Sequence, residues 1–207
     1  MLHVLLAGLL ITCLSRVHAH CVTYGDCDGL PCVNSTSALP MFGEQGRNIV
    51  SELCPHLKGG GKFCCDDHQV KVLKSSISKA DSLLSGCKSA KENFRSLLCD
   101  MVCGPEQSDY LQVEKMEQHG GKTRATHLRY FLSTTYSDKV WKSTKTQSTL
   151  LCGHLFSSCS KDDLFGFLGN NRWTKLRTDY VIGDDPPARI VHASHEHMSC
   201  GSETCVC

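Results

Sequence analysis

Cysteine is the residue that most constrains how this chain can fold. The 207-residue sequence contains 15 cysteines, far more than a cytosolic enzyme of similar length carries. In an oxidising compartment such a set predicts a disulfide framework, whereas in a reducing compartment it predicts metal sites. The compartment therefore decides between the two, and the sequence evidence about it lies at the N-terminus.

The N-terminal residues have the features of a secretory signal peptide. Leu2 to Leu14 is nearly continuous apolar sequence, which is long enough for a signal-peptide core and too short to cross a bilayer. Val17 and Ala19 then stand at the two positions where a cleavage site prefers modest or small residues. We therefore expect a signal peptide at 1–19 and one mature domain at 20–207, with an uncleaved anchor as the alternative.

Cleavage would leave an even number of cysteines, as expected of a fully oxidised secreted domain. The removed segment contains Cys13, so 14 of the 15 cysteines remain. Lys and Arg number 22 and Asp and Glu number 21, a balance that gives no electrostatic argument for a nucleic-acid partner. No later stretch is apolar over the roughly 18 residues that a membrane helix needs, so no membrane span is expected.

The product is expected to be either secreted or in the endolysosomal lumen. Asn34, Ser35 and Thr36 form a glycosylation sequon in a polar segment, which predicts a glycoprotein with its glycan on Asn34. In these compartments the cysteines form disulfide bonds. Such bonds would compensate for a core supplied by a hydrophobic fraction of only 41%.

Hydrophobic spacing predicts an α+β fold that is rich in helix. Apolar residues between Val70 and Leu84 recur at spacings of three and four, which places them on one helix face. Residues 21–40 lack a periodic pattern and are expected to be loops held by Cys27 and Cys32. We therefore predict a disulfide-stapled single domain with a small mixed β-sheet. The expected helices span 46–57, 66–84, 89–102 and 126–142, and the expected strands span 178–182 and 189–192.

No catalytic or metal site stands out from the residues. A Ser-His-Asp triad lacks the strand–Gly-x-Ser-x-Gly–helix context, and an even set of cysteines should be consumed in bridges. Zinc binding near the C-terminus is the alternative, but a solvated tail with an oxidised cysteine is favoured. The candidate zinc ligands are His192, His195, His197 and Cys200. We therefore expect no enzyme activity, no metal and no cofactor.

Gln69 places a neutral amide on the apolar face of the helix expected at 66–84. It precedes Leu73 by four residues, so the two side chains lie on the same face. One interpretation is a boundary residue that bonds the backbone. The other is a fixed hydrogen-bonding group at the end of an apolar slot, which is how a site recognises one polar atom of an apolar ligand.

Further motifs follow one another along most of the mature chain. They are 21–27 (CVTYGDC), 52–55 (ELCP), 64–66 (CCD) with Gln69 and Leu73, 93–94 (NF), 98–99 (LC), 103–105 (CGP), 107–108 (QS), Tyr130 and 150–153 (LLCG). Together they resemble the N-terminal domain of the Niemann-Pick type C1 family, the lysosomal cholesterol transporters. The resemblance implies the fold of that domain, and after Cys159 it is weak except at the final cysteines.

The resemblance also implies a cysteine pairing that uses all 14 mature cysteines. Two further family cysteines fall on Ala90 and about Thr144, so one whole bridge is absent and no thiol is left over. The implied bridges are Cys21–Cys64, Cys27–Cys32, Cys54–Cys99, Cys65–Cys103, Cys87–Cys205, Cys152–Cys159 and Cys200–Cys207.

The same resemblance implies a carrier that binds one cholesterol-like sterol in a deep apolar pocket. Gln69 matches the glutamine that bonds the sterol hydroxyl, and Asp26 matches a nearby acidic residue. The matches to the pocket wall are Thr23, Leu73, Leu98 and Tyr130, and the matches to the apolar lip through which sterol enters are Leu150 and Leu151. The partner that the family implies is a small soluble sterol-transfer protein.

Departures from the family pattern leave other functions open. Pro31 stands where the family has a second hydroxyl-binding residue, an asparagine, and it offers neither an amide nor an N–H. Thr23 replaces a tryptophan of the wall. The alternatives are a carrier of another apolar ligand, a protein-interaction module on the same scaffold, and a carrier of a polar vitamin. The sequence contains no counterpart of the membrane transporter, so we expect a free-standing carrier, with a truncated transporter as the alternative.

Overall fold

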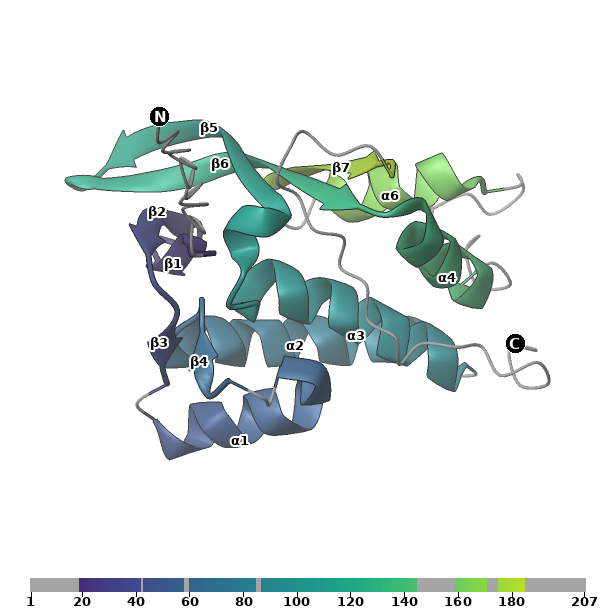
Figure 1. The fold of residues 1–207 in the computed structure, drawn as a ribbon, viewed down its shortest axis with the longest axis horizontal. Coiled ribbons are helices and arrows are strands. Elements are labelled where there is room, and N and C mark those ends of the chain that lie inside the picture. Colours follow the sequence, from purple (N-terminus) through teal and green to yellow (C-terminus); the bar gives the residue numbers. More distant parts are fainter. Residues whose placement is uncertain are drawn as a thin grey trace, which may run out of the picture.

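A sheet lying over a layer of helices is the basic arrangement of the chain. The computed structural model describes residues 19–41, 43–57, 60–84, 87–144, 159–170 and 175–184. Two long helices, α2 (Asp67–Leu83) and α3 (Lys88–Cys103), lie beneath the sheet (Figure 1). Helix α1 (Glu44–Leu53) packs on the side of α2 that is away from the sheet, whereas α4 (Thr134–Thr144) and α6 (Lys161–Gly169) lie at one end of the sheet.

Helix α2 begins at a reciprocal hydrogen-bonded cap. The Asp66 carboxylate accepts the backbone N–H of Gln69 at 2.8 Å, and the Gln69 side-chain oxygen accepts the N–H of Asp66 at 3.1 Å. The stripe that the spacing predicts is buried, and it consists of Val70, Leu73, Ile77, Ala80 and Leu84. The helix expected at 66–84 is therefore confirmed.

The other helices near the N-terminus also agree with the spacing. The helix expected at 46–57 corresponds to α1 and a short 3-10 helix at Pro55–Leu57. The helix expected at 89–102 is α3, which ends at Gly104. Among the described helices, none is both long and apolar enough to cross a membrane.

Strand β6 (Lys122–Leu132) is the centre of a mixed five-stranded sheet. Strand β5 (Leu111–His119) pairs with it antiparallel to form a hairpin. On the other edge of β6, strand β2 (Pro31–Thr36) pairs antiparallel near its start and β7 (Arg177–Ile182) pairs parallel at its end. Strand β1 (Cys21–Asp26) completes the sheet beside β2. The predicted fold class, a helix-rich α+β domain with a small mixed sheet, is confirmed.

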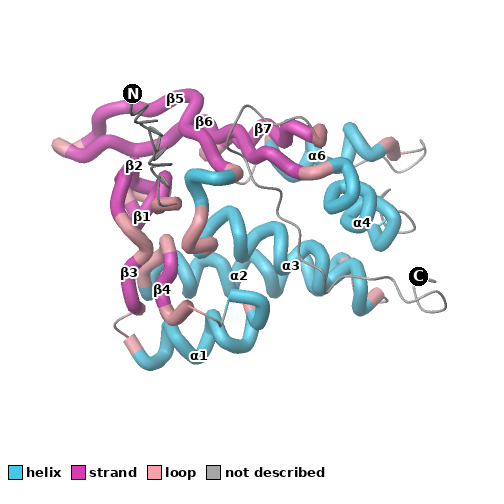
Figure 2. Tube along the Cα trace, in the orientation of Figure 1, coloured by secondary structure: helices cyan, strands magenta, loops and turns pink. Residues whose placement is uncertain are grey.

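The loops expected at residues 21–40 are a wrong prediction. This segment forms β1, β2 and the short strand β3 (Leu39–Pro40), which pairs with β4 (Lys62–Phe63) (Figure 2). Asp28 and Gly29 form the turn between β1 and β2, whereas Gly25, Asp26 and Ser35 lie within the strands, so the composition hid strands of only a few residues each. Strand β7 agrees with the strand expected at 178–182, and the strand expected at 189–192 lies outside the described residues.

The helix expected at 126–142 is wrong in its first half. Residues up to Leu132 belong to β6, and only the following segment is helix α4. Tyr130 faces one side of the strand and Phe131 the other, yet both are buried. A strand buried on both faces does not alternate between apolar and polar residues, so its apolar spacing resembled that of a helix.

Disulfide bonds join β1, the helices and the loops between them. The bridges that the structure describes pair the cysteines as the family resemblance implies, and they are Cys21–Cys64, Cys27–Cys32, Cys54–Cys99 and Cys65–Cys103. Cys87 and Cys159 are disulfide-bonded as well. The partners implied for these two, Cys205 and Cys152, lie outside the described residues, as does the implied pair Cys200–Cys207.

The interior contains two groups of packed apolar side chains. The first, which we call the sheet core, joins the sheet to α3, α4 and α6 and includes Tyr130 and Phe165. The second, the helix core, lies among α1, α2 and α3 and includes Ile49 and Leu73. Leu98 on α3 is half-buried and packs against both. The two cores therefore meet at this helix.

Candidate ligand-binding site

The amide of Gln69 is fixed where α2 meets β1. Its oxygen accepts the backbone N–H of Gly25 at 2.7 Å as well as that of Asp66 at 3.1 Å. The pairing of β1 with β2 shifts register between Thr23 and Asp26, and Gly25 has a φ of +84°. This irregularity, which favours glycine, releases the Gly25 N–H from the sheet. The interpretation of Gln69 as a residue that bonds the backbone is therefore confirmed, and its amide is held in one orientation.

Gln107 is the site residue that sequence reasoning missed. It is fully buried, and its side-chain oxygen accepts the backbone N–H groups of Val22 and Thr23, each at 3.0 Å. Its side-chain nitrogen donates to the carbonyls of Met101 and Val102 at 3.0 and 3.2 Å. One amide thus joins β1 to the end of α3. The available signal was the Gln107-Ser108 motif within the family resemblance.

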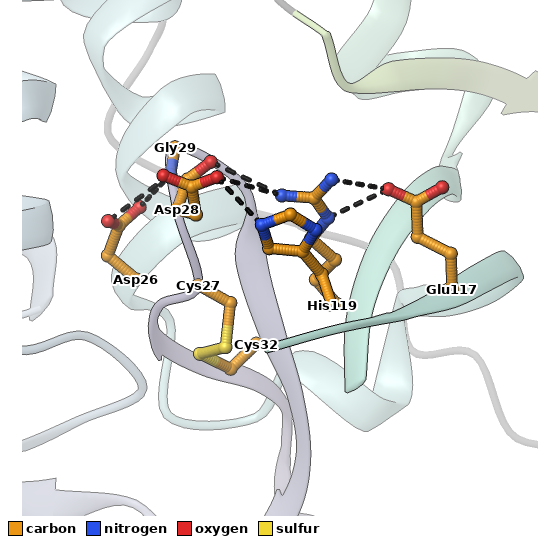
Figure 3. Close-up of polar contacts among 8 residues, drawn as sticks. Asp26, Cys27, Asp28, Gly29, Cys32, Glu117 and His119 are labelled. Carbon is orange, nitrogen blue, oxygen red and sulfur yellow. Dashed lines mark hydrogen bonds and ion pairs between the residues drawn. A yellow bond between two sulfur atoms is a disulfide. The ribbon is translucent and has the colours of Figure 1, made fainter. Parts of the chain in front are cut away.

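Asp26 and Pro31 lie at the two ends of the loop that the Cys27–Cys32 bridge closes. Asp26 is exposed, and its carboxylate oxygens accept the backbone N–H of Gly29 at 3.1 and 3.3 Å (Figure 3). Pro31 pairs with Asp26 at the start of β2. Asp26 therefore stabilises its own turn, and among the described residues no hydrogen bond joins it to Gln69.

The same loop is attached to the tip of the β5–β6 hairpin by charged side chains. The Asp28 carboxylate lies 3.1 Å from His119 Nε2 and 3.4 Å from Arg124 Nη1. Arg124 also pairs with Glu117, with 2.7 Å between Nη2 and Oε1. These groups converge between the loop and the hairpin (Figure 3). Because Asp28 and His119 are largely exposed, the link stabilises the position of the loop more than the fold.

The predicted wall residues lie inside the two cores. Leu73 belongs to the helix core and Tyr130 to the sheet core, and Leu98 packs against both. Thr23 is buried on β1, and its hydroxyl is 3.5 Å from the Gln107 oxygen. The structure thus divides these residues between the two cores and strand β1. Leu150 and Leu151, the predicted lip, lie outside the described residues.

The side chain of Tyr130 is uncharged within the sheet core. Its hydroxyl donates to the carbonyl of Leu97 at 3.3 Å. Burial raises the pKa of Tyr130 well above its usual value, and the negative charge of Asp100 adds to this shift. The phenol therefore keeps its proton, and its ring contributes apolar area between Tyr110 and Tyr180.

A separate groove of about 650 Å³ lies on the surface between α1 and α2. Its lining is mostly polar and consists of Glu44, Gln45, Asn48, Ile49, Glu52, Lys71 and Lys74. None of the described residues predicted for the sterol site lines it. A water-exposed polar groove of this kind is unlike the apolar pocket that the resemblance implies.

Within the described ranges, no group of three His, Cys, Asp or Glu side chains is placed to hold a metal ion. The zinc alternative concerned the C-terminal histidines and Cys200, which lie outside those ranges. The sequon residue Asn34 is exposed on β2, where an attached glycan would reach solvent.

The fold and the site define a disulfide-bonded α+β domain in which two apolar cores meet at α3 and one oriented amide lies at the start of α2. Residues 18–207 match the model of the family described as the Niemann-Pick C1 N terminus. The chain belongs to this family.

Its relatives are named as cholesterol transporters. NPC intracellular cholesterol transporter 1 of the pig, Sus scrofa, is 28% identical over 186 residues, which cover 78% of this chain and 14% of the pig protein. NPC intracellular cholesterol transporter 1 homolog 1 of Caenorhabditis elegans is 30% identical over 131 residues, 56% of this chain and 10% of the relative. The human NPC1-like intracellular cholesterol transporter 1 is 28% identical over 116 residues, 49% of this chain and 8% of the relative. The chain thus spans a small part of the length of each.

Proposed function

We propose that this protein is a non-enzymatic carrier that binds one sterol, with the sterol hydroxyl at the amide of Gln69. Membership of the Niemann-Pick C1 N terminus family supports a sterol ligand, since the matched relatives are named as cholesterol transporters. The observation that carries the role of Gln69 is its fixed amide, held by two backbone N–H groups one helical turn from Leu73. A ligand meeting this amide would not have to order it first.

Apolar contacts would supply most of the affinity in this proposal. Leu98 occupies the junction of the two cores, with Leu73 on one side and Tyr130 on the other. Burial of apolar surface is worth roughly 25 cal/mol per Å², so a rigid ring system gains most of its binding energy there. The polar contact at Gln69 orients the ligand, and Leu150 and Leu151 would form the entrance.

The compartment and the partner are also part of the proposal. Removal of residues 1–19 as a signal peptide would deliver the domain to the secretory or endolysosomal lumen, where its disulfide bonds persist. Exposure of Asn34 supports a glycan at that position. A small soluble sterol-transfer protein would then be the donor or acceptor of the ligand.

Mass spectrometry of organic extracts tests the carrier function. The protein is purified from the medium of secreting insect cells, and the extracted lipid is compared with the amount of protein. We expect close to one sterol per protein chain. The Gln69→Leu protein should carry less sterol than the Gln118→Leu protein, which serves as the control because Gln118 is exposed on β5. An extract free of sterol, with no uptake of labelled cholesterol, would overturn the proposal.

A protein-interaction module is the second candidate, and the burial of the wall residues favours it. Leu73 is 4% exposed and Tyr130 is not exposed at all, so both are packed as ordinary core residues. In that case the scaffold would be retained with its pocket closed. The extraction separates the two candidates, because a closed scaffold would carry no sterol.

A further inference from the structure

The amide of Gln69 has only one possible orientation. Its oxygen lies 2.7 Å from the backbone nitrogen of Gly25 and 3.1 Å from that of Asp66. Both of those groups are donors, so the amide nitrogen cannot take the place of the oxygen. The backbone N–H of Gln69 is used too, in its 2.8 Å bond to the Asp66 carboxylate. The hydrogen-bond network therefore fixes which end of the amide faces away from the cap.

The end that remains is a donor and nothing else. An amide oxygen has two lone pairs, and both are occupied here by backbone N–H groups. The amide nitrogen of Gln69 carries two N–H groups and makes no hydrogen bond to any described residue. A ligand at Gln69 is therefore met by N–H groups and by no free acceptor on that side chain.

The neighbouring loop adds no second amide. Pro31 has no side-chain polar atom and no backbone N–H. The Asp26 carboxylate is exposed and accepts the N–H of Gly29. On β1, the Thr23 hydroxyl is directed to the oxygen of Gln107 at 3.5 Å. The oriented donor that the structure offers beside Leu73 is thus the amide of Gln69.

We propose that this site recognises the polar end of its ligand only as a hydrogen-bond acceptor, so that it takes sterol ketones as well as sterol alcohols. The inference rests on the proposed function. A carbonyl oxygen accepts from the Gln69 amide and has no proton of its own to satisfy, whereas a hydroxyl needs both a donor and an acceptor. A steroid hydrocarbon, which has no oxygen, would leave the Gln69 amide without a hydrogen-bond partner.

A glutamate at position 69 provides the matched test. Glutamate is also a favoured capping-box residue, so one carboxylate oxygen of Gln69→Glu can still accept the N–H groups of Asp66 and Gly25. Its second oxygen accepts but does not donate when ionised. The variant therefore keeps the cap and reverses the polarity presented to the ligand, so it should bind an alcohol in preference to a ketone.

Competition against labelled cholesterol measures both effects with the full mature protein at about pH 7.5, where a carboxylate is ordinarily ionised. For the wild type we expect cholestenone to compete within about fivefold of cholesterol, and cholestane to compete about tenfold less well or worse. For Gln69→Glu we expect cholestenone to fall at least about tenfold behind cholesterol.

The possible outcomes separate the inference from the function on which it rests. If the wild type binds cholesterol but takes cholestenone about tenfold more weakly, the acceptor-only site is wrong and the carrier function stands. If the wild type binds neither, the carrier function itself is wrong. The wild-type comparison needs no variant, so a Gln69→Glu protein that fails to fold does not prevent a decision.

Discussion

The side-chain oxygen of Gln107 accepts the backbone N–H of Thr23 at 3.0 Å, across 84 residues of sequence. The same side chain bonds Val22 and the carbonyls of Met101 and Val102. Strand β1 is therefore held against α3 by a single amide that substitutes for a neighbouring strand. Because Gly25 follows on the same strand, the position of the N–H that reaches Gln69 depends on this amide.

Replacement of Gln107 by leucine should destabilise the domain strongly. It would leave two N–H groups and two carbonyls without their present partner, and each buried polar group left unpaired costs about 1–3 kcal/mol. We expect Gln107→Leu to lower the free energy of unfolding by at least about 3 kcal/mol in denaturant titrations. Gln118→Leu, at an exposed position, should change it by less than about 0.5 kcal/mol. Equal effects of the two substitutions would show that the Gln107 amide does not hold β1.

Gly46 on α1 leaves room for the carboxylate of Asp67 on α2. A Cβ at position 46 would overlap Asp67 Oδ1 and would lie 2.5 Å from the sulfur of Met41. The other oxygen of Asp67 accepts the N–H of Gly43 at 3.0 Å, which caps α1. We expect Gly46→Ala to destabilise the protein by about 1–3 kcal/mol, because alanine would displace this cap.

The matched substitution on α6, Gly166→Ala, should stabilise the protein. A Cβ on Gly166 would meet no atom within 4 Å, and the residue is in the middle of a helix. Alanine at an unhindered helical position stabilises by about 0.5–1 kcal/mol. Thermal unfolding of both variants checks the pair, and stabilisation by Gly46→Ala would contradict the described contact between α1 and α2.

Tyrosine ionisation should remain coupled to unfolding at alkaline pH. Burial raises the pKa of Tyr110, Tyr130 and Tyr136 well above the usual value of about 10. A raised pKa in the folded state contributes stability that is complete below pH 10, the pKa in the unfolded state, and is lost as the pH rises above it. We expect the phenolate absorbance of the buried tyrosines to appear in one step together with the loss of ellipticity. Only the ionisation of Tyr24 should come before this step. Smooth titration of all five tyrosines in folded protein would contradict the described sheet core.

Asp179 on β7 should contribute stability that is lost in acid. Desolvation raises its pKa, but the hydrogen bonds from Arg177 and His127 and the positive charges of those side chains outweigh it, so the pKa lies below the usual value. A lowered pKa gives stability above the unfolded value of about 4 that disappears as the pH falls through the folded value. Asp179→Asn should therefore be less stable than wild type at neutral pH, with the difference shrinking below about pH 4. A difference independent of pH would show that the charge of Asp179 is not responsible.

Helices α1 and α2 could be predicted because each buries one face. On α2 the buried residues lie three or four apart, and the remaining surface is exposed, so the spacing identified the helix. Strand β6 gave the opposite result because both of its faces are buried near its end, at Tyr130 and Phe131. The elements that cover each face of β6 are distant from it in sequence. The local spacing of apolar residues therefore carries no information about them.

The candidate site was predicted at the level of residues and not of contacts. Gln69 stood out because an amide occupies an apolar helix face, whereas its partner Gly25 is 44 residues away and becomes available only through the irregular pairing of β1. Gln107 follows a Gly-Pro pair in what reads as a loop, so nothing local indicated that it would be fully buried. Asp26 was expected near the ligand hydroxyl, and the structure shows its carboxylate bonded to the N–H of Gly29.

Saturation binding of labelled cholesterol to the purified mature protein tests the central claim most directly. We predict saturable binding of one sterol per chain, weakened about tenfold or more by Gln69→Leu and unchanged by Gln118→Leu. Gln118 is the control because it is an exposed glutamine near the tip of the β5–β6 hairpin. Absence of saturable binding to the folded wild type, or equal binding by wild type and Gln69→Leu, would contradict the account.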